Sequence, residues 1–411
     1  MIAFESKSPG ARIDRETNGR IVEDLLRRLF PICRSITGEG LRTTLKTISE
    51  YVPLKIIEIP TGTQVFDWQI PDEWNIRDAY IKNEAGERIV DFRQSNLHVL
   101  NYSTPIHQKM TLEELRPHLH TLPAQPNAIP YLTSYYKRDW GFCLTHHQYL
   151  ALSPGEYEVC IDGTLAPGSL TLAESILPGE ASHQILFSTY CCHPSLANNE
   201  LSGPIITTLL YQYLAALPKR RFTYHFYYGP ETIGALAFLA LHGKRLKENL
   251  LAGFVVTCCG DRGSFTYKQV RNPNNALDRV VLHVLKHSGV EFKAVPYFPT
   301  GSDERQYSSP GFDLPIGSLM RSTYGQYPEY HTSLDNLDFI SIDSLLETLE
   351  LYVDCVYALE HNLRYENLCP FGEPMLSKYV SCPRTSYTKK SRDIVHIVAE
   401  SSHPHIGLTI A

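Results

Sequence analysis

The amino-acid sequence predicts an α/β protein in which helices cover a mostly parallel sheet and a small β-rich domain is inserted near the start. From Gly168 onward, buried strand segments alternate with helical segments, which is the pattern of a parallel sheet. Between Leu54 and about Asp162, apolar and polar residues alternate instead and Pro and Asn are frequent, which indicates the inserted domain. The chain has 411 residues and 43% apolar content, so we expect two or three domains.

The predicted elements follow the apolar spacing along the chain. Residues 21–52 show helical spacing, and the segment 33–38 interrupts it, which predicts two helices joined by a Gly-containing turn. The α/β part has predicted strands at 184–190, 221–228, 253–259 and 312–317 and predicted helices at 204–217, 233–241, 276–287 and 342–365. The expected domains are N-terminal helices of the α/β domain (1–52), the inserted β-rich domain (53–163), the α/β domain (164–370) and a short C-terminal tail (371–411).

Charge and apolar content exclude several partners. The net charge is -6 and no long basic run is present, so we expect no nucleic-acid partner. No apolar stretch is long enough to span a bilayer and the N-terminus lacks a signal-peptide core, which predicts a cytoplasmic protein without a membrane partner. Ten cysteines occur without a CxxC pair, so they are expected to be reduced and structural, with Cys192 beside His193 as the one exception to keep in view.

Residues able to do chemistry follow the predicted strands. His193, Glu231 and Asp261 each come shortly after a buried strand, and Asp303 and His331 lie in later loops. Because the carboxyl ends of parallel strands meet at one edge of a sheet, these loops are expected to line one crevice. Zinc hydrolases need imidazoles and carboxylates as metal ligands and a further carboxylate as proton acceptor, so the pattern indicates a zinc site.

The sequence also resembles a family of bacterial aminopeptidase-like proteins, which are distant relatives of the co-catalytic zinc aminopeptidases and carboxypeptidases. The resemblance covers nearly all of the chain to about Phe371. The matching segments are 65–68, 74–81, 131–136, 140–143, Cys192-His193-Pro194-Ser195, Leu201-Ser202-Gly203, Pro230-Glu231-Thr232-Ile233-Gly234, Gly301-Ser302-Asp303-Glu304-Arg305-Gln306-Tyr307 and Tyr330-His331-Thr332-Ser333-Leu334-Asp335-Asn336.

The resemblance implies an aminopeptidase-like three-layer α/β/α domain, interrupted by the small β domain, with zinc at the strand ends. His193 matches the first metal histidine of the family and His331 the last. Glu231 matches the catalytic carboxylate that acts as general base. Asp261 is placed like the peptidase carboxylate that follows the next strand, and Asp303 lies in a loop that lines the site in relatives.

Two positions depart from the family pattern. Thr232 replaces a second glutamate, and Asn199 stands where the family has an aspartate as the central metal ligand. An amide is a poor zinc ligand. Three outcomes stay open: Glu200 replaces the missing ligand, or His193, Asp261 and His331 together hold one metal, or the site has lost metal and catalysis. The first two are together favoured, so the expected cofactor is zinc, one ion, with candidate ligands His193, Asn199, Glu200, Asp261 and His331.

Several of these residues also have structural explanations. Glu231 could stabilise a helix N-terminus, Asp261 could close a turn, and Asp303 could cap a helix. His193 alone could cap backbone groups. Candidate substrate-binding residues are Asp303, Arg305, Tyr307, His146 and Arg321, although the basic residues could simply be solvated and His146 could belong to an aromatic cluster.

The predicted function is therefore zinc-dependent hydrolysis of an amide, of the aminopeptidase type. Glu231 is expected to accept a proton from water and return it to the leaving amine. The expected substrate is a small amino-acid-derived molecule, a short peptide or an amino sugar. The alternatives are a binding protein that keeps only the fold, and a biosynthetic enzyme that transfers an acyl group or forms an amide. The aromatic residues of the inserted domain leave room for a subunit contact, and hence for a homo-oligomer: Tyr131, Tyr135, Tyr136 and Trp140.

Overall fold

The computed structural model describes residues 13–273 and 275–362. The predicted C-terminal tail, 371–411, lies outside the described residues. One compact unit extends to Cys355, and a second unit begins at Val356. Both sheets described below belong to the first unit.

An eight-stranded mixed sheet forms the centre of the first unit, in the order β1-β10-β12-β11-β13-β16-β14-β15. Its four middle strands, β12, β11, β13 and β16, are parallel, whereas β1 and β10 add an antiparallel edge. This arrangement confirms the predicted α/β class with a mostly parallel sheet. The strands are β1 Lys55–Pro60, β10 Ser169–Leu177, β11 Gln184–Tyr190, β12 Thr223–Gly229, β13 Leu250–Val255, β14 Phe265–Lys268, β15 Phe292–Val295 and β16 Ile316–Met320.

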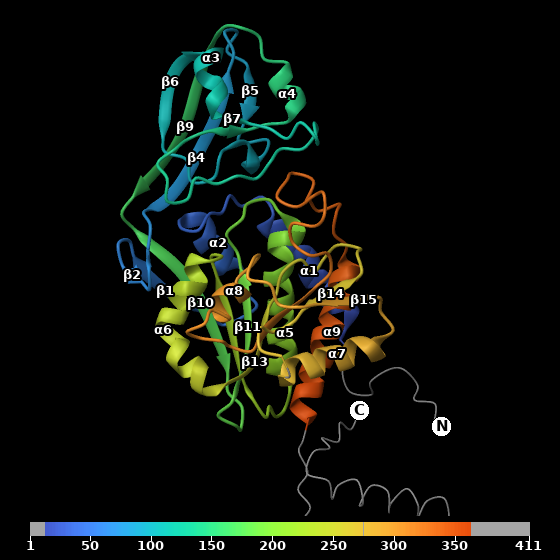
Figure 1. The fold of residues 1–411 in the computed structure, drawn as a ribbon. Coiled ribbons are helices and arrows are strands. Elements are labelled where there is room, and N and C mark those ends of the chain that lie inside the picture. The colour runs from blue at the N-terminus through green and yellow to red at the C-terminus, as the bar shows by residue number, and fades with distance from the viewer. Residues whose placement is uncertain (1–12, 274, 363–411) are drawn as a thin grey trace, which may run out of the picture. The chain divides into compact units, whose positions relative to one another are not determined.

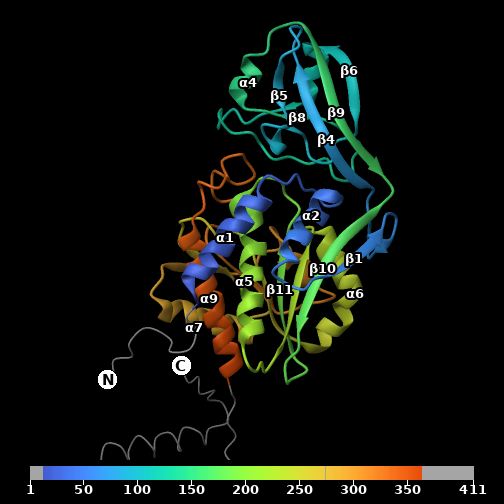
Figure 2. The same ribbon diagram turned by 180° about the vertical axis from the view of Figure 1, so that it is seen from behind.

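Helices cover both faces of this sheet (Figures 1 and 2). On one face, Phe238 of α6 packs on Tyr227 of β12 with ring centres 4.5 Å apart. On the other face, Tyr211 of α5 and Tyr352 of α9 pack edge-on against the aromatic rings of the middle strands. The helices are α1 Arg15–Leu29, α2 Glu39–Ile48, α5 Ser202–Ala216, α6 Ile233–Asn249, α7 Ala276–Ser288, α8 Glu304–Tyr307 and α9 Ile342–His361.

The inserted domain is built on a four-stranded antiparallel sheet in the order β5-β4-β9-β6. Its two long strands, β4 and β9, pair over most of their length and lead back to the main sheet (Figure 1). Because β1 pairs with β10 in the main sheet, the insertion lies between Pro60 and Ser169, which differs from the predicted limits of 53–163. Its elements are β2 Gln64–Val65, β3 Trp68–Gln69, β4 Glu73–Lys82, β5 Arg88–Asp91, β6 Ile106–Thr111, α3 Leu112–Leu115, β7 Leu119–His120, β8 Phe142–Cys143, α4 His146–Leu150 and β9 Glu156–Ala166, with single 3₁₀ turns at Asn96–His98 and Arg116–His118.

Arg42 joins the inserted domain to the main domain. Its guanidinium donates two hydrogen bonds to the carboxylate of Glu73 on β4, at 2.9 and 2.7 Å. It also contacts Glu58 on β1, at 3.1 Å, and Glu39 on its own helix, at 2.6 Å. A two-bond Arg–carboxylate pair that is partly buried stabilises more than an exposed ion pair, so this contact helps to hold β4 against α2.

The change Glu73→Gln is expected to lower the free energy of unfolding by about 1–2 kcal/mol at pH 7. The hydrogen bonds from Arg42 hold the pKa of Glu73 at about 2, below its usual 4.5. This contribution is therefore present above about pH 5 and is lost as the pH falls towards 2. Urea unfolding at several pH values checks the change, since the difference between the two proteins should shrink with falling pH. Glu39→Gln, which removes an exposed partner of the same arginine, is the control and should lower the free energy of unfolding by less than about 0.5 kcal/mol.

Within residues 13–273 and 275–362, no helix combines the length and the apolar character that a membrane crossing requires.

Candidate active site

Four loops at the carboxyl ends of the middle strands contain strained backbone. Ser195, Thr232, Cys258 and His331 all have positive φ angles, of 48°, 61°, 51° and 53°. Such angles are unfavourable for residues other than glycine, and most of all for a β-branched residue such as Thr232. Strain of this kind is kept where the surrounding structure fixes a functional geometry, so these loops mark the candidate site.

His193 follows β11 and is buried. Its Nδ1 atom lies 2.8 Å from Oε2 of Glu200, and its Nε2 atom lies 3.6 Å from Oε2 of Glu231. Burial alone would lower the pKa of His193, but the charges of Glu200 and Glu231 outweigh burial and raise it. A carboxylate on one ring nitrogen orients an imidazole and leaves the other nitrogen to face a metal, which is the role that the position of Glu200 fits.

His331 lies beside His193, with ring centres 5.3 Å apart. The edge of Tyr131, from the inserted domain, packs against both imidazoles at 4.9 and 5.2 Å. Nε2 of His331 is buried and has no hydrogen-bond partner among the described residues. Burial, together with the nearby His193, lowers the pKa of His331 to about 3, so its ring is neutral at pH 7.

Glu231 opens the loop after β12, and its backbone N–H donates to the sulfur of Cys192. Burial raises the pKa of Glu231. The carboxyl group of Asp303 is also buried, and burial and the charge of Glu231 raise its pKa well above the usual value. Asp303 accepts a hydrogen bond from the backbone N–H of Thr232 at 2.7 Å, and Arg305 donates to the Thr232 hydroxyl at 2.9 Å. A carboxylate with a raised pKa suits proton transfer near neutral pH.

Asn199 lies in a π-helical turn, Ala197–Leu201, that leads into α5. Its Nδ2 donates to the Tyr190 hydroxyl at 3.0 Å, and its Oδ1 is buried without a hydrogen-bond partner in the described chain. Asp335 holds this turn by accepting hydrogen bonds from three backbone N–H groups, those of residues 197, 198 and 199. π-helical turns occur often at functional sites because they re-aim side chains.

Part of this arrangement opens onto a cavity of about 450 Å³. Four of the predicted site residues line it: His193, Glu231, Arg305 and His331. Tyr131, Tyr135 and Tyr136, which were predicted to leave room for a subunit contact, also line this cavity. At its mouth, Trp68 and Tyr136 meet edge-on with ring centres 5.4 Å apart and are 40% and 52% exposed.

Other predicted site residues have partners outside this cavity. Asp261 accepts four hydrogen bonds, from Asn198, Gly263 and the backbone and hydroxyl of Ser322, so its part as a metal ligand stays a prediction.

The remaining predicted substrate-binding residues also point to other contacts. The Tyr307 hydroxyl bonds to Ser188 in the core, and His146 bonds to Thr121 inside the inserted domain. Arg321 pairs with Glu347 and donates to the carbonyl oxygen of Gly263. Their roles in substrate binding stay predictions as well.

Four residues that contribute to the site were not predicted as site residues from the sequence. Arg34 is buried and donates from Nε to the carbonyl oxygen of His193 at 3.1 Å. Tyr131 covers both histidines, Asp335 holds the π-helical turn, and Asn198 bonds to Asp261. Arg34 lies in the segment that interrupts the helical spacing near the N-terminus, and a charged residue in such an interruption is the sequence signal that could have found it.

The two histidines fit a zinc ion. Zn–N bonds of about 2.1 Å and tetrahedral angles place the ring centres of two zinc-bound imidazoles roughly 5 Å apart. The separation of His193 and His331, 5.3 Å, agrees with this, and the unpartnered nitrogen of His331 supplies a free ligand atom. Cys192, His193 and Glu200 also bring ligand atoms within 4.8 Å of one another, although burial raises the pKa of Cys192 well above its usual value and keeps it a neutral thiol.

Comparisons with known proteins agree with this fold. A family model described as a domain of unknown function, DUF4910, matches residues 23–362. A protein of Clostridium acetobutylicum, named as a candidate polysaccharide biosynthesis protein with an aminopeptidase-like domain, is 48% identical over 88% of this chain and 83% of its own. A crystal structure of a candidate peptidase from the same species has 47% identity and a TM-score of 0.85 over 89% of this chain and 86% of that one. A zinc aminopeptidase from Bacillus subtilis has 12% identity and a TM-score of 0.61 over 84% of this chain and 95% of its own, a likeness of fold alone.

Proposed function

Because the chain belongs to the DUF4910 family and has the fold of zinc aminopeptidases, we propose that it is a zinc-dependent amide hydrolase of the aminopeptidase type. The observation that carries the proposal is that two histidines and a carboxylate with a raised pKa, His193, His331 and Glu231, line one cavity. A shared fold does not by itself establish an activity, so the proposal depends on these side chains.

In this proposal, His193 and His331 would hold a single zinc ion, with their Nε2 atoms as ligands. Zinc bound there would polarise a carbonyl and make water more acidic. Glu231 then takes the proton of the attacking water and delivers it to the departing amine nitrogen as the amide bond breaks. Glu200 keeps His193 in the orientation in which Nε2 faces Glu231, since it occupies the other ring nitrogen.

The surroundings of Thr232 support one ion rather than two. In the peptidases that the sequence resembles, a second glutamate stands at this position. Here the Thr232 hydroxyl accepts a hydrogen bond from Arg305, which brings a permanent positive charge to the same loop. A cation at that place opposes the binding of a second divalent ion.

The cavity supports a small substrate with a flat or ring-shaped part. Trp68 and Tyr136 offer partly exposed aromatic surface at the mouth, and Arg305 can bind an anionic group. The Clostridium relative is named for polysaccharide biosynthesis, which favours an N-acylated amino sugar over an amino-acid amide as the first substrate to test.

The proposal is tested by incubating chelator-stripped protein, with and without added zinc, with aminoacyl anilides and with N-acylated amino sugars. Release of free amine that depends on zinc supports the hydrolase. Tight binding of these compounds without any turnover would instead identify a binding protein, and turnover only with an added acceptor amine would identify an acyl-transfer enzyme.

Trp68→Ala is expected to raise KM by about 2- to 10-fold and to leave kcat unchanged, because the ring contributes to substrate binding away from the reacting atoms. Steady-state kinetics on the best substrate checks this. Phe66→Ala is the matched control, since Phe66 is similarly exposed but packs against Phe312 and does not line the cavity. Equal effects of the two changes would contradict a specific role for Trp68.

A further inference from the structure

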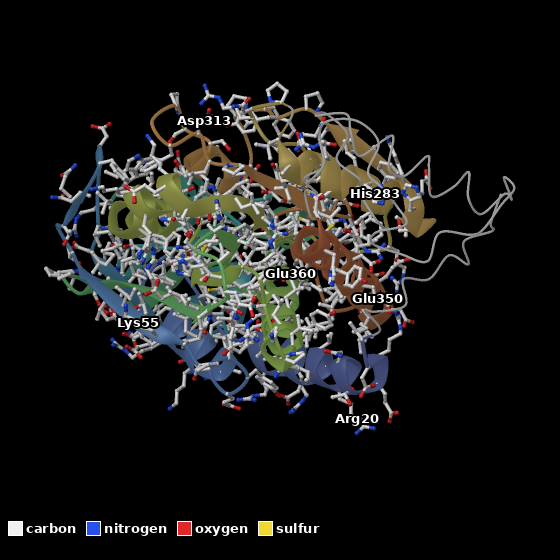
Figure 3. All side chains as sticks on the ribbon, turned by 90° about the horizontal axis from the view of Figure 1, so that it is seen from below. Arg20, Lys55, His283, Asp313, Glu350 and Glu360 are labelled. Atoms are coloured by element: carbon white, nitrogen blue, oxygen red, sulfur yellow. The ribbon has the colours of Figure 1, made fainter. Side chains whose placement is uncertain are left out.

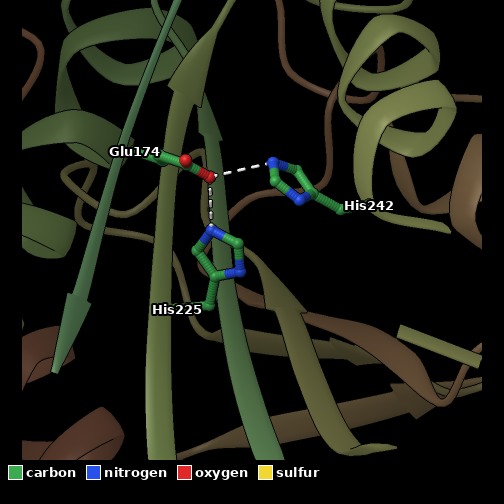
Figure 4. Close-up of side chains that lie close together, drawn as sticks. All are labelled: Glu174, His225 and His242. Atoms are coloured by element: carbon green, nitrogen blue, oxygen red, sulfur yellow. Dashed lines mark hydrogen bonds and ion pairs between the residues drawn. The ribbon is translucent and has the colours of Figure 1, made fainter. Parts of the chain in front are cut away.

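A second group of potential metal ligands lies on the α6 face of the main sheet. In the antiparallel pair β10–β12, Glu174 is opposite Tyr227 and Ile176 is opposite His225, so Glu174 and His225 are diagonal neighbours on one face. His242 reaches the same place from α6, one turn after Phe238, which packs on Tyr227. The three side chains thus come from three elements and converge (Figure 4).

The contacts within this group centre on one carboxylate oxygen. Nε2 of His225 lies 2.9 Å from Oε2 of Glu174, and Nε2 of His242 lies 3.0 Å from the same oxygen. Within the described residues, Nε2 of His242 still has no partner in hydrogen-bond geometry. His225 thus shares a hydrogen bond with Glu174, whereas Nε2 of His242 is close to the same oxygen without a directed hydrogen bond and is available as a ligand atom.

The spacing agrees with a tetrahedral ion. The ring centres of His225 and His242 are 5.4 Å apart. This is close to the roughly 5 Å expected for two imidazoles on one zinc. The three ligand atoms lie within 4.8 Å of one another, and an opening of a few tenths of an ångström around Oε2 would admit the ion.

Burial and access also suit a metal site. The side chains of His225 and Glu174 are almost fully buried, whereas His242 is 17% exposed and gives a route from solvent. Lys55, on the edge strand β1, contacts the other oxygen of Glu174 at 2.9 Å and leaves Oε2 free for an ion. The side chain of Lys55, which is labelled in Figure 3, is 72% exposed.

The site is separate from the candidate active site. His225 lies near the start of β12, whereas Glu231 follows its end, so the strand extends over four residue steps, or about 13 Å, from His225 to Gly229.

We propose that Glu174, His225 and His242 bind a divalent transition-metal ion, zinc in the first instance, that fixes α6 on strands β10 and β12. Two imidazoles and a carboxylate are a complete set of three zinc ligands, with a fourth position for water. At the candidate active site, two histidines are proposed to hold the ion, and an amide, Asn199, stands where relatives have a carboxylate ligand, which makes the weaker set. Zinc in the purified protein is therefore expected at this second site even when the first is removed.

The test uses the full chain carrying His193→Ala and His331→Ala, which removes the first site. Chelator-stripped protein is dialysed against micromolar zinc, and bound metal is measured by elemental analysis. One zinc per chain is expected, with a rise in Tm of about 3 °C or more on zinc addition. Adding His242→Gln should abolish both the zinc binding and the rise in Tm, and circular dichroism should show that the helix content is kept.

His287→Gln in the same background is the matched control, because His287 is exposed and pairs with another histidine, His283, four residues earlier on α7. Figure 3 shows His283 well away from Lys55 in that view. Loss of zinc with His287→Gln, or retention of zinc with His242→Gln, would overturn the proposal. Should the double change prevent folding, His242→Gln alone is compared with the unmodified protein, where it must remove one equivalent of zinc and leave amide hydrolysis unchanged.

Discussion

Glu231→Gln is expected to lower kcat for amide hydrolysis by at least about 100-fold while KM changes little. Glutamine has nearly the same shape and keeps the backbone contact to Cys192, but it cannot accept a proton from water. Because the carboxylate acts on the reacting water rather than on the bound substrate, its loss should appear in the chemical step. Steady-state kinetics on whichever of the proposed test substrates is hydrolysed measures the effect.

The exposed Glu180 is the matched control, and Glu180→Gln should leave both constants unchanged. Equal zinc contents of the two variants would show that the metal site is intact. A Glu231→Gln variant that retains more than about a third of the original kcat would contradict the assignment of Glu231 as the proton acceptor.

Phe187→Ala is expected to lower the free energy of unfolding by about 3–5 kcal/mol. Phe187 is fully buried at the middle of β11 and stacks on Phe226 of β12 and Phe254 of β13, with ring centres 5.6 and 5.5 Å apart. Tyr352 packs edge-on against two of these rings, Phe187 and Phe254. The total free energy of unfolding of such a domain is only about 5–15 kcal/mol, so the variant should be close to unfolding at 37 °C.

Denaturant unfolding followed by circular dichroism measures this loss. Phe187→Leu, which keeps most of the volume, is the matched variant and should cost roughly 1–2 kcal/mol. Similar midpoints for Phe187→Ala and the unmodified protein would contradict the claim that the three-ring stack is central to the sheet that positions His193 and Glu231.

Much of the fold could be predicted because its strands are buried on both faces. The predicted strand at residues 184–190 coincides with β11, and the helices at 204–217 and 276–287 agree with α5 and α7 to within two residues. The start of the insertion was harder to place. β1 pairs with β10, more than a hundred residues later, and its alternating pattern resembles that of the inserted domain next to it.

Only part of the candidate site could likewise be predicted from the sequence. Residues directly after a strand, such as His193 and Glu231, could be predicted, because the end of a parallel strand places them. Tyr131 could not, because its contact with both histidines depends on how the inserted domain folds over the main sheet. The cluster around Glu174 could not be predicted either. Glu174 and His225 are more than fifty residues apart, His242 lies on a helix, and the three meet only through strand register and helix packing.

The metal content of the His242→Gln protein tests the central claim most directly, because this variant lacks the second site. The account predicts that it binds one zinc after dialysis against the metal, and that adding His193→Ala and His331→Ala removes this zinc together with amide hydrolysis. If His242→Gln binds no zinc, or if the zinc remains after both histidines are replaced, His193 and His331 do not form a zinc centre and the proposed hydrolase is wrong.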